Sequence, residues 1–261
     1  MNQVVDVVVG TPICRRGANI IDKFLANQKE IQQNYPSSEL VLATEESDFI
    51  EELEKRLSFY ELRGRVILFE VIKPDYARSR LWNIACGREA IRQYVLFQTA
   101  VRYLLSLDAD LTCDPSIIKI LEGEIQGYDV AISGQAVRVG PGTSLGPVSC
   151  SMLTRSTLGK IRFRCYEFNN GEFLDDGIAL EMDLFKLRLR IRKGFFLSIC
   201  HYRNENDAAC IDPHPLGLLR RITDSLPMRY VLHRTSIMAR YDIPKRIKFL
   251  PYRIRRIIKM K

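Results

Sequence analysis

The feature that most constrains the fold of this chain is the alternation of short apolar runs with longer amphipathic segments. Four β-rich runs and three segments of helical pattern alternate, at residues 4–9, 19–33, 39–43, 47–62, 65–72, 77–100 and 102–110. Strands that alternate with helices of this length require crossover connections, which build a mostly parallel sheet. We therefore predict an α/β fold whose ligands bind beyond the carboxyl ends of the strands.

The second half of the chain is less regular. It begins with a strand pattern at 128–133 and continues into a Gly- and Pro-rich stretch, 134–149, which is a candidate acceptor loop. The segment 174–194 has apolar stripes at helical spacing, so we predict a mostly buried helix that ends near Gly194, although the letters LRLRIR within it also fit a strand. We place the main domain at 1–215 and a C-terminal helical, basic amphipathic extension at 216–261.

The positive charge of the chain is concentrated at its C-terminal end. The segment 245–261 contains eight of the 39 Lys and Arg and none of the 31 Asp and Glu, so the segment 1–244 carries 31 of each sign. Basic residues alternate in 245–261 with large apolar ones, which is typical of a segment that lies in the headgroup region of an anionic membrane. The alternative is a solvated, partly disordered end.

The cysteines and the apolar runs indicate the cellular location. The seven cysteines are odd in number and form no C-x-x-C pair, which argues against a disulfide framework and a zinc site. We expect most of them to be small core residues, while a disulfide stays open for a hyperthermophile protein. No run is long enough for a signal peptide core or a membrane span. We expect a cytoplasmic protein whose tail attaches peripherally to the inner face of the membrane.

Asp108 and Asp110 end the last β-rich run of the first half, in the sequence SLDADLTCDPS. Residues i and i+2 of a strand project to the same face, so these carboxylates can converge where the strand ends. A hard divalent cation bound through few carboxylates, with phosphate oxygens and water as its other ligands, needs this arrangement. The alternative is that Asp110 is a turn or cap residue, because Asp114 and Pro115 follow it and open a helix. An isolated D-x-D favours that alternative, so the surrounding sequence decides.

With its surroundings, the motif resembles the nucleotide-sugar-dependent glycosyltransferases of the GT-A fold, and among them the large inverting family 2. The resemblance covers most of the chain and implies a Rossmann-like, mixed, mostly parallel sheet flanked by helices. In that family the first strand ends at positions that line the nucleotide pocket, matched here by Thr11 and Pro12. An Ala-Arg-Asn sequence that opens the helix before the metal strand reads Ala77, Arg78 and Ser79 here, so the Arg matches and the Asn does not.

The resemblance also implies a metal site and a general base. Asp110 would bind the metal, and Asp108 would lie near the ribose or the metal. His201 stands where some members have a late histidine that is also a metal ligand. The acidic pair before a helix, Asp175 and Asp176, makes Asp176 the general base.

Two further matches concern the nucleotide base and the end of the chain. An acidic residue after the second strand usually contacts the base, and Thr44, Glu45 and Glu46 share that place here, of which we take Glu45. The stretch 229–241 resembles a helix that closes many family 2 chains, with Thr235 in place of its Asn.

Each of these residues also has a purely structural interpretation. His201 could be a strand-end histidine bonded to the backbone, and Arg78 a solvated residue at a helix start. Asp175 and Asp176 could both be helix N-caps, because acids are favoured at that end. One of the two can cap the helix while the other catalyses.

The implied reaction is sugar transfer from a nucleotide-diphosphate sugar to a hydroxyl of a glycan or lipid-linked acceptor, with inversion and with Mn²⁺ or Mg²⁺ as cofactor. A sugar-nucleotide nucleotidyltransferase is a rival, but it needs a Gly-rich phosphate loop that carries Arg and Lys, to which GTPICRRGAN has a partial likeness. A nucleic-acid-binding protein is suggested by the pI near 9.2. We expect no nucleic-acid partner, because the body is neutral and the tail has no recognised binding module.

Overall fold

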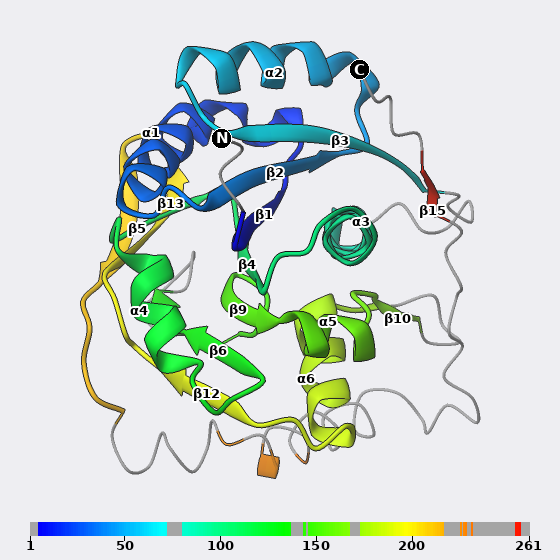
Figure 1. Ribbon diagram of the computed structural model, residues 1–261, viewed down its shortest axis with the longest axis vertical. Coiled ribbons are helices and arrows are strands. Elements are labelled where there is room, and N and C mark those ends of the chain that lie inside the picture. The colour runs from blue at the N-terminus through cyan, green and yellow to red at the C-terminus, as the bar shows by residue number, and fades with distance from the viewer. Residues whose placement is uncertain are drawn as a thin grey trace.

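The computed structural model describes residues 5–71, 80–136, 143–144, 146–167, 173–216, 225, 227–228, 231 and 254–256. Its centre is one sheet with the strand order β12-β6-β9-β4-β1-β2-β3-β15 (Figure 1). The bounds of these strands are, in chain order, β1 Val7–Pro12, β2 Ser38–Thr44, β3 Gly64–Val71, β4 Tyr103–Leu107, β6 Val130–Ser133, β9 Cys150–Thr154, β12 Ile191–Gly194 and β15 Ile254–Arg256. β9 and β15 pair with their neighbours in antiparallel fashion and the other pairs are parallel, so the predicted mixed, mostly parallel sheet is confirmed.

Helices cover both faces of the sheet (Figure 1). One face packs against α1 (Ala18–Asn34), α2 (Ile50–Phe59) and α4 (Ile117–Glu124), and the other against α3 (Arg80–Gln98), α5 (Arg155–Lys160) and α6 (Asp176–Lys186). Alternate side chains of β1 enter opposite cores: Val7 and Val9 pack with the first group of helices, and Val8 packs with the second. A strand buried on both faces reads as a continuous apolar run, which explains the sequence VVVGT.

β1 and β4 form the switch point of the sheet. The strands β2 and β3 are added on one side of β1, whereas β4 pairs with its other side. The connections after β1 and β4 therefore run in different directions. In sheets of this class, the crevice between two such connections is where ligands bind.

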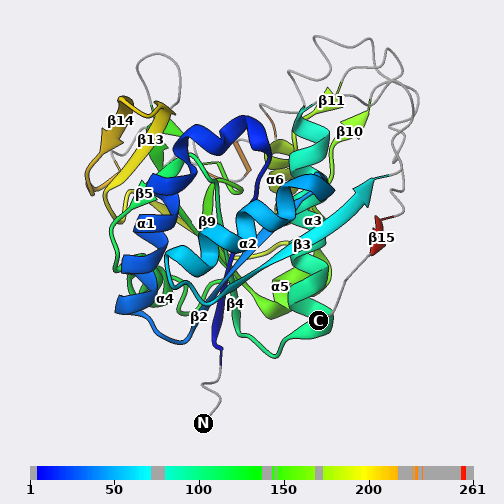
Figure 2. The same cartoon turned by 90° about the horizontal axis from the view of Figure 1, so that it is seen from above.

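Smaller sheets lie near the carboxyl ends of the strands of the main sheet. They are β14-β13-β5 (Asp207–Ile211, Ile199–Asn204 and Leu111–Cys113), β7-β8 (Gln135–Ala136 and Thr143–Ser144) and β10-β11 (Tyr166–Glu167 and Phe173–Leu174). Figure 2 shows the pairs β13-β14 and β10-β11 at the end of the molecule opposite the N-terminus. β1 starts near the N-terminus, so these pairs stand at the carboxyl-end side of the strands.

Two cysteines differ from the expectation that most are core residues. Cys200 and Cys210 form a disulfide, because they are register partners in the antiparallel pair β13-β14. Their spacing in the sequence gave no sign of this pairing, since only the hairpin brings them together. The other five cysteines are free, and four of them are buried, as expected.

Two segments also depart from the sequence prediction. The helix predicted over 174–194 ends at Lys186, the chain turns through Arg188 in the left-handed region at φ 53°, and β12 then pairs with β6. The strand alternative for LRLRIR is thus correct from Ile191 on, because the edge of β6 offers a ladder of hydrogen bonds. In the extension predicted to be helical, residues 227, 228 and 231 are helical, whereas residues 254–256 form strand β15 against β3. Most of 217–261 lies outside the described residues, as do 72–79 and part of the candidate acceptor loop. Within the described part of the chain, no helix is both long and apolar enough to cross a membrane.

Candidate active site

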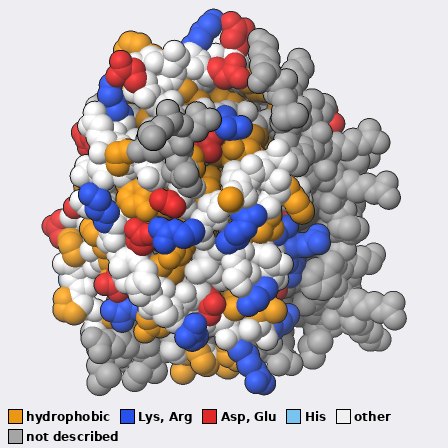
Figure 3. All heavy atoms as spheres, in the orientation of Figure 1, with side chains coloured by type: hydrophobic (Ala, Val, Ile, Leu, Met, Phe, Trp, Pro, Cys, Tyr) orange, Lys and Arg blue, Asp and Glu red, His pale blue; other side chains and the backbone are white. Residues whose placement is uncertain are grey.

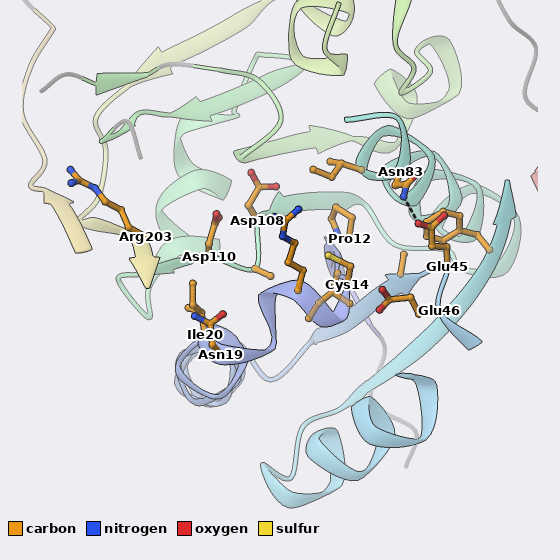
Figure 4. A pocket seen from close by; sticks show the side chains of 16 residues that line it. Pro12, Cys14, Asn19, Ile20, Glu45, Glu46, Asn83, Asp108, Asp110 and Arg203 are labelled. Atoms are coloured by element: carbon orange, nitrogen blue, oxygen red, sulfur yellow. Dashed lines mark hydrogen bonds between the residues drawn. The ribbon is translucent and has the colours of Figure 1, made fainter. Parts of the chain in front are cut away.

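A cavity of about 600 Å³ opens at the switch point, beyond the carboxyl ends of β1, β2 and β4 (Figure 4). Its walls come from elements far apart in the sequence. They include Pro12 at the end of β1, Glu45 after β2, Asn83 of α3, and Asp108 and Asp110 after β4. The cavity therefore lies where the alternation of strands and helices predicts a ligand site.

Asp108 and Asp110 follow directly on β4 and line this cavity. The N–H of Asp108 donates to the carbonyl of Ser149 at 3.0 Å, and its carbonyl accepts from the N–H of Leu111 at 3.2 Å, which closes a turn. Figure 4 shows both carboxylates pointing in the same direction. Asp110 therefore occupies a turn, as the structural alternative proposed, and its side chain still faces the cavity.

His201 lies beside Asp110. The distance from His201 Nε2 to Asp110 Oδ2 is 3.4 Å, and the two side chains are 12% and 19% exposed. Backbone pairing places them: β13 runs antiparallel to β5, and the N–H of Tyr202 donates to the carbonyl of Asp110 at 2.8 Å. The order of the motifs in the sequence had suggested that His201 lies near Asp110, and the structure places the two side chains next to each other.

The donor atoms at this point suit a divalent cation. Asp108 and Asp110 offer carboxylate oxygens and His201 an imidazole nitrogen, a set that Mn²⁺ or Mg²⁺ can accept. Among the described residues, no group of three or more His, Cys, Asp or Glu is arranged so that it could hold a metal ion, so these three side chains are not a preformed metal site. An ion here would take further ligands from substrate phosphates and water, as ions at nucleotide sites commonly do. Asp108, Asp110 and His201 can therefore supply only part of the ligands of such an ion.

Asp175 and Asp176 open helix α6 and differ in environment. The carboxylate of Asp175 accepts the N–H of Ile178 at 2.8 Å, so Asp175 is the N-cap. Asp176 is 3% exposed, and its Oδ2 accepts from Nη1 of Arg88 at 2.6 Å. Burial raises the pKa of Asp176, and the neighbouring Arg88 opposes this rise. One residue of the pair caps the helix, and the other enters a buried ion pair.

Arg88 was not identified from the sequence. Its Nη1 bonds Asp176, and its Nη2 donates to Oδ1 of Asp108. Helix α3 approaches β1 closely at Gly87, where a Cβ would lie 2.9 Å from the Cβ of Pro12. Arg88 was missed because its partners are 20 and 88 positions away in the chain, and only the fold brings them together.

The opposite end of the cavity is lined by Glu45, Glu46 and Asn83 (Figure 4). Nδ2 of Asn83 donates to Oε1 of Glu45, while Glu46 accepts the N–H of Arg15 at 2.7 Å. Asn83 was also missed, because the family pattern has its Asn directly after the Arg, where this chain has Ser79. Asn83 is four positions after Ser79 in the sequence, so the Asn that lines the cavity is not at the position that the resemblance singles out.

Of the other residues predicted to bind the nucleotide, one lines the cavity, one does not, and one is outside the described residues. Thr11 is fully buried and does not line the cavity: its hydroxyl donates to the carbonyl of Leu107 at 2.8 Å and joins β1 to β4. The next residue, Pro12, does line it. Arg78 lies outside the described residues. Two further cations, Arg16 and Arg203, are among the described residues that line the cavity, and neither was among the predicted site residues.

No protein-family model matches the chain, and no curated protein matches it. Solved structures do match. The mannosyltransferase PcManGT from Pyrobaculum calidifontis, in complex with GDP-Man and Mn²⁺, is similar over 92% of this chain and 72% of its own, with a TM-score of 0.52 and 12% identity. Staphylococcus aureus TarS is similar over 72% of this chain, with a TM-score of 0.50 and 14% identity, and this chain spans 35% of the length of TarS. At these identities the likeness concerns the fold. The chain has the GT-A fold that the sequence resemblance implied.

Proposed function

We propose that the protein is a glycosyltransferase that uses a nucleotide-diphosphate sugar and a divalent metal ion. The observation that carries this proposal is the 3.4 Å approach of His201 Nε2 to Asp110 Oδ2, next to a cavity that Asp108 also lines. Two carboxylates and an imidazole beside a cavity of this size suit a metal ion with a nucleotide diphosphate. The GDP-Man and Mn²⁺ of the similarly folded PcManGT support this class of ligand.

The donor would be held along the cavity by groups of complementary charge. Asp110, His201 and Asp108 would hold Mn²⁺ or Mg²⁺, which when bound acts as a Lewis acid toward the diphosphate. Arg16 and Arg203 supply cations that can bond phosphate oxygens. At the other end, the carboxylate of Glu45 is oriented by Asn83 and accepts hydrogen bonds from the nucleotide base.

Asp176 is the general base of the proposed reaction. The oxygen of the acceptor hydroxyl forms a bond to the anomeric carbon while the bond from that carbon to the diphosphate oxygen breaks, and the hydroxyl proton passes to Asp176. A displacement in one step inverts the anomeric centre, by the logic of inverting hydrolases. Burial raises the pKa of Asp176 and so makes its carboxylate a better proton acceptor than an exposed aspartate.

The acceptor in this proposal is a glycan or a lipid-linked molecule at the inner face of an anionic membrane. The eight Lys and Arg of the segment 245–261 support this location, because they alternate with large apolar side chains. In this proposal the catalytic domain is 1–215, which includes every described residue that lines the cavity, and the segment 216–261 is an extension that attaches to the membrane.

The proposal is tested by donor binding and by product analysis. The full chain is screened against nucleotide sugars, GDP-mannose first, with Mn²⁺ or with EDTA, because a ligand that binds the native state raises the melting temperature. Release of a nucleoside diphosphate from the donor found in this way supports the proposal. Release of pyrophosphate from a nucleoside triphosphate and a sugar phosphate would identify a nucleotidyltransferase instead. Binding of no nucleotide sugar in the presence of metal would refute the proposal.

A further inference from the structure

Arg88 contacts both carboxylates to which the proposed reaction gives a part, Asp108 toward the metal and Asp176 as the general base. Its Nη1 lies 2.6 Å from Oδ2 of Asp176, and its Nη2 bonds Oδ1 of Asp108. Asp176 belongs to α6 and Asp108 follows β4, so α3 links two separate parts of the chain through this one side chain. The side chains of Arg88 and Asp176 are 5% and 4% exposed, so solvent screens their interaction little.

The charges around Asp176 require a cation. Asp108 from the end of β4 and Asp175 from the same turn both raise the pKa of Asp176, and the thiol of Cys165 is also near. Among the described residues, Arg88 is the cation that opposes them. Burial of a carboxylate beside others of like charge strongly favours its neutral form unless a cation is present.

We infer that Arg88 is a positioning residue that holds Asp108 and Asp176 in one fixed arrangement. Its planar guanidinium offers two Nη groups at a fixed spacing, and each group holds one carboxylate. The contact favours the charged form of Asp176 against burial and fixes the orientation of its carboxylate, while Asp108 stays at the cavity wall. This role rests on the proposed function, because it takes from that proposal the parts of Asp108 and Asp176.

The substitution Arg88→Lys keeps the positive charge of the side chain but removes the planar guanidinium with its two Nη groups. An ammonium group keeps the positive charge but is a single point of contact, so it can hold one carboxylate at a time. We expect Arg88→Lys to lower turnover at pH 7 at least roughly tenfold. The acid limb of the pH profile should also move to higher pH, because the charged form of Asp176 loses part of its stabilisation. Turnover should therefore recover as the pH is raised.

Arg92→Lys is a matched control on the same helix. Arg92 is also buried and bonds Glu89 at 2.7 Å and the carbonyl of Leu158 at 2.7 Å. Its replacement makes the same chemical change away from the cavity. It should lower the melting temperature and leave the acid limb where it is in the wild type. The same outcome for Arg88→Lys would show that Arg88 serves stability alone and would overturn the inference.

A readout without turnover separates this inference from the proposed function. The ¹³C carboxyl resonance of Asp176, assigned through its loss in Asp176→Asn, is followed against pH in the wild type and in Arg88→Lys. A higher midpoint in Arg88→Lys supports the inference even if no nucleotide sugar is turned over. Equal midpoints overturn it even if the enzyme is an active glycosyltransferase.

A double variant covers the case in which Arg88→Lys does not fold. Arg88→Lys is then combined with Asp176→Asn, which removes one of the two charges that Arg88 holds. Recovery of a cooperative thermal transition shows that the two side chains act as a pair. Failure of the double variant to recover would overturn the coupling of Arg88 to Asp176.

Discussion

His201 Nε2 lies 3.4 Å from Asp110 Oδ2, and the backbone rather than the side chains holds the two residues at this distance. β13 pairs with β5 so that His201 is opposite Leu111, and the N–H of Tyr202 bonds the carbonyl of Asp110. If the two side chains bind a metal as proposed, a backbone ladder that already holds them side by side reduces the ordering that binding requires.

This arrangement predicts that metal-dependent nucleotide binding requires both side chains. Asp110→Ala should abolish the gain in nucleotide affinity that Mn²⁺ produces, and His201→Ala should weaken it roughly tenfold to a hundredfold, by analogy with other metal sites. Titration calorimetry with a nucleoside diphosphate measures both. His214→Ala is the control, because His214 is stacked on Phe195 and is not among the lining residues. Unchanged nucleotide affinity of Asp110→Ala with Mn²⁺ present would count against the site.

Sequence patterns indicated those residues of the candidate site whose positions depend on local structure. The apolar run YLLSL marks a buried strand, so a side chain that follows it must emerge at a carboxyl end of the sheet, and Asp108 and Asp110 were found in this way. His201 was found through its place in a family pattern. Both routes placed these residues near the cavity because strand ends and motif order are recorded in short stretches of sequence.

The long-range contacts could not be predicted in the same way. Arg88 lies on α3, and nothing in its neighbouring residues indicates that it will meet a carboxylate 88 positions later. The end of α6 at Lys186 was missed for a related reason: the segment after it fits a helix and a strand equally well, and the open edge of β6 decides. Thr11 was expected at the pocket, but its hydroxyl instead bonds Leu107 on the neighbouring strand.

Asp176→Asn tests the general base. Asn has nearly the same size but accepts no proton, so turnover should fall at least about 100-fold while donor and metal affinity stay within a few-fold. Asp175→Asn is the comparison, because Asp175 caps α6 through Ile178. It should cost stability, of order 1 kcal/mol or less, and leave turnover largely intact. Loss of turnover in Asp175→Asn alone would shift the base by one residue.

Asp176→Asn should not lower the stability of the folded protein at neutral pH. Burial raises the pKa of Asp176 in the folded state, so the folded state favours the protonated acid. The contribution of such a group to stability is present at low pH and is lost as the pH rises through the folded-state pKa. The asparagine side chain stays neutral at every pH, so the variant does not lose stability through ionisation of this buried group. The melting temperature of Asp176→Asn at pH 7 should therefore be no lower than that of the wild type. A marked fall in melting temperature would show that the ion pair with Arg88 outweighs the cost of burial.

The disulfide between Cys200 and Cys210 should stabilise the hairpin that carries His201. The bond closes a loop over a sequence separation of 10, for which chain entropy gives a stabilisation of roughly 2 to 3 kcal/mol. A reductant should therefore lower the melting temperature of the wild type by several degrees, and that of Cys200→Ser/Cys210→Ser by much less. Because His201 follows Cys200 directly, Mn²⁺ affinity should fall in the double variant too. Equal melting temperatures with and without reductant would show that the bond does not contribute.

The basic tail predicts binding to anionic membranes. Truncation after Asp242 removes all eight of the Lys and Arg in the segment 245–261, together with the apolar side chains between them. Each basic residue near an anionic surface contributes about 1 kcal/mol, and the apolar residues add burial in the headgroup region. The full chain should therefore sediment with phosphatidylserine vesicles, less so at high salt, and not with neutral phosphatidylcholine vesicles. The truncated chain should stay in the supernatant with both.

A charge-neutral tail separates this effect from damage to the fold, because the truncation also removes β15, which pairs with β3. A full-length variant with Gln at Lys245, Arg246, Lys248, Lys259 and Lys261 keeps β15 and the apolar residues and loses five cations. If electrostatic attraction to anionic lipid drives the binding, this variant should sediment far less than the wild type and retain its melting temperature. Sedimentation of the truncated chain equal to that of the full chain would instead show that the segment 243–261 is a solvated end, and the acceptor would then have to reach the cavity from solution.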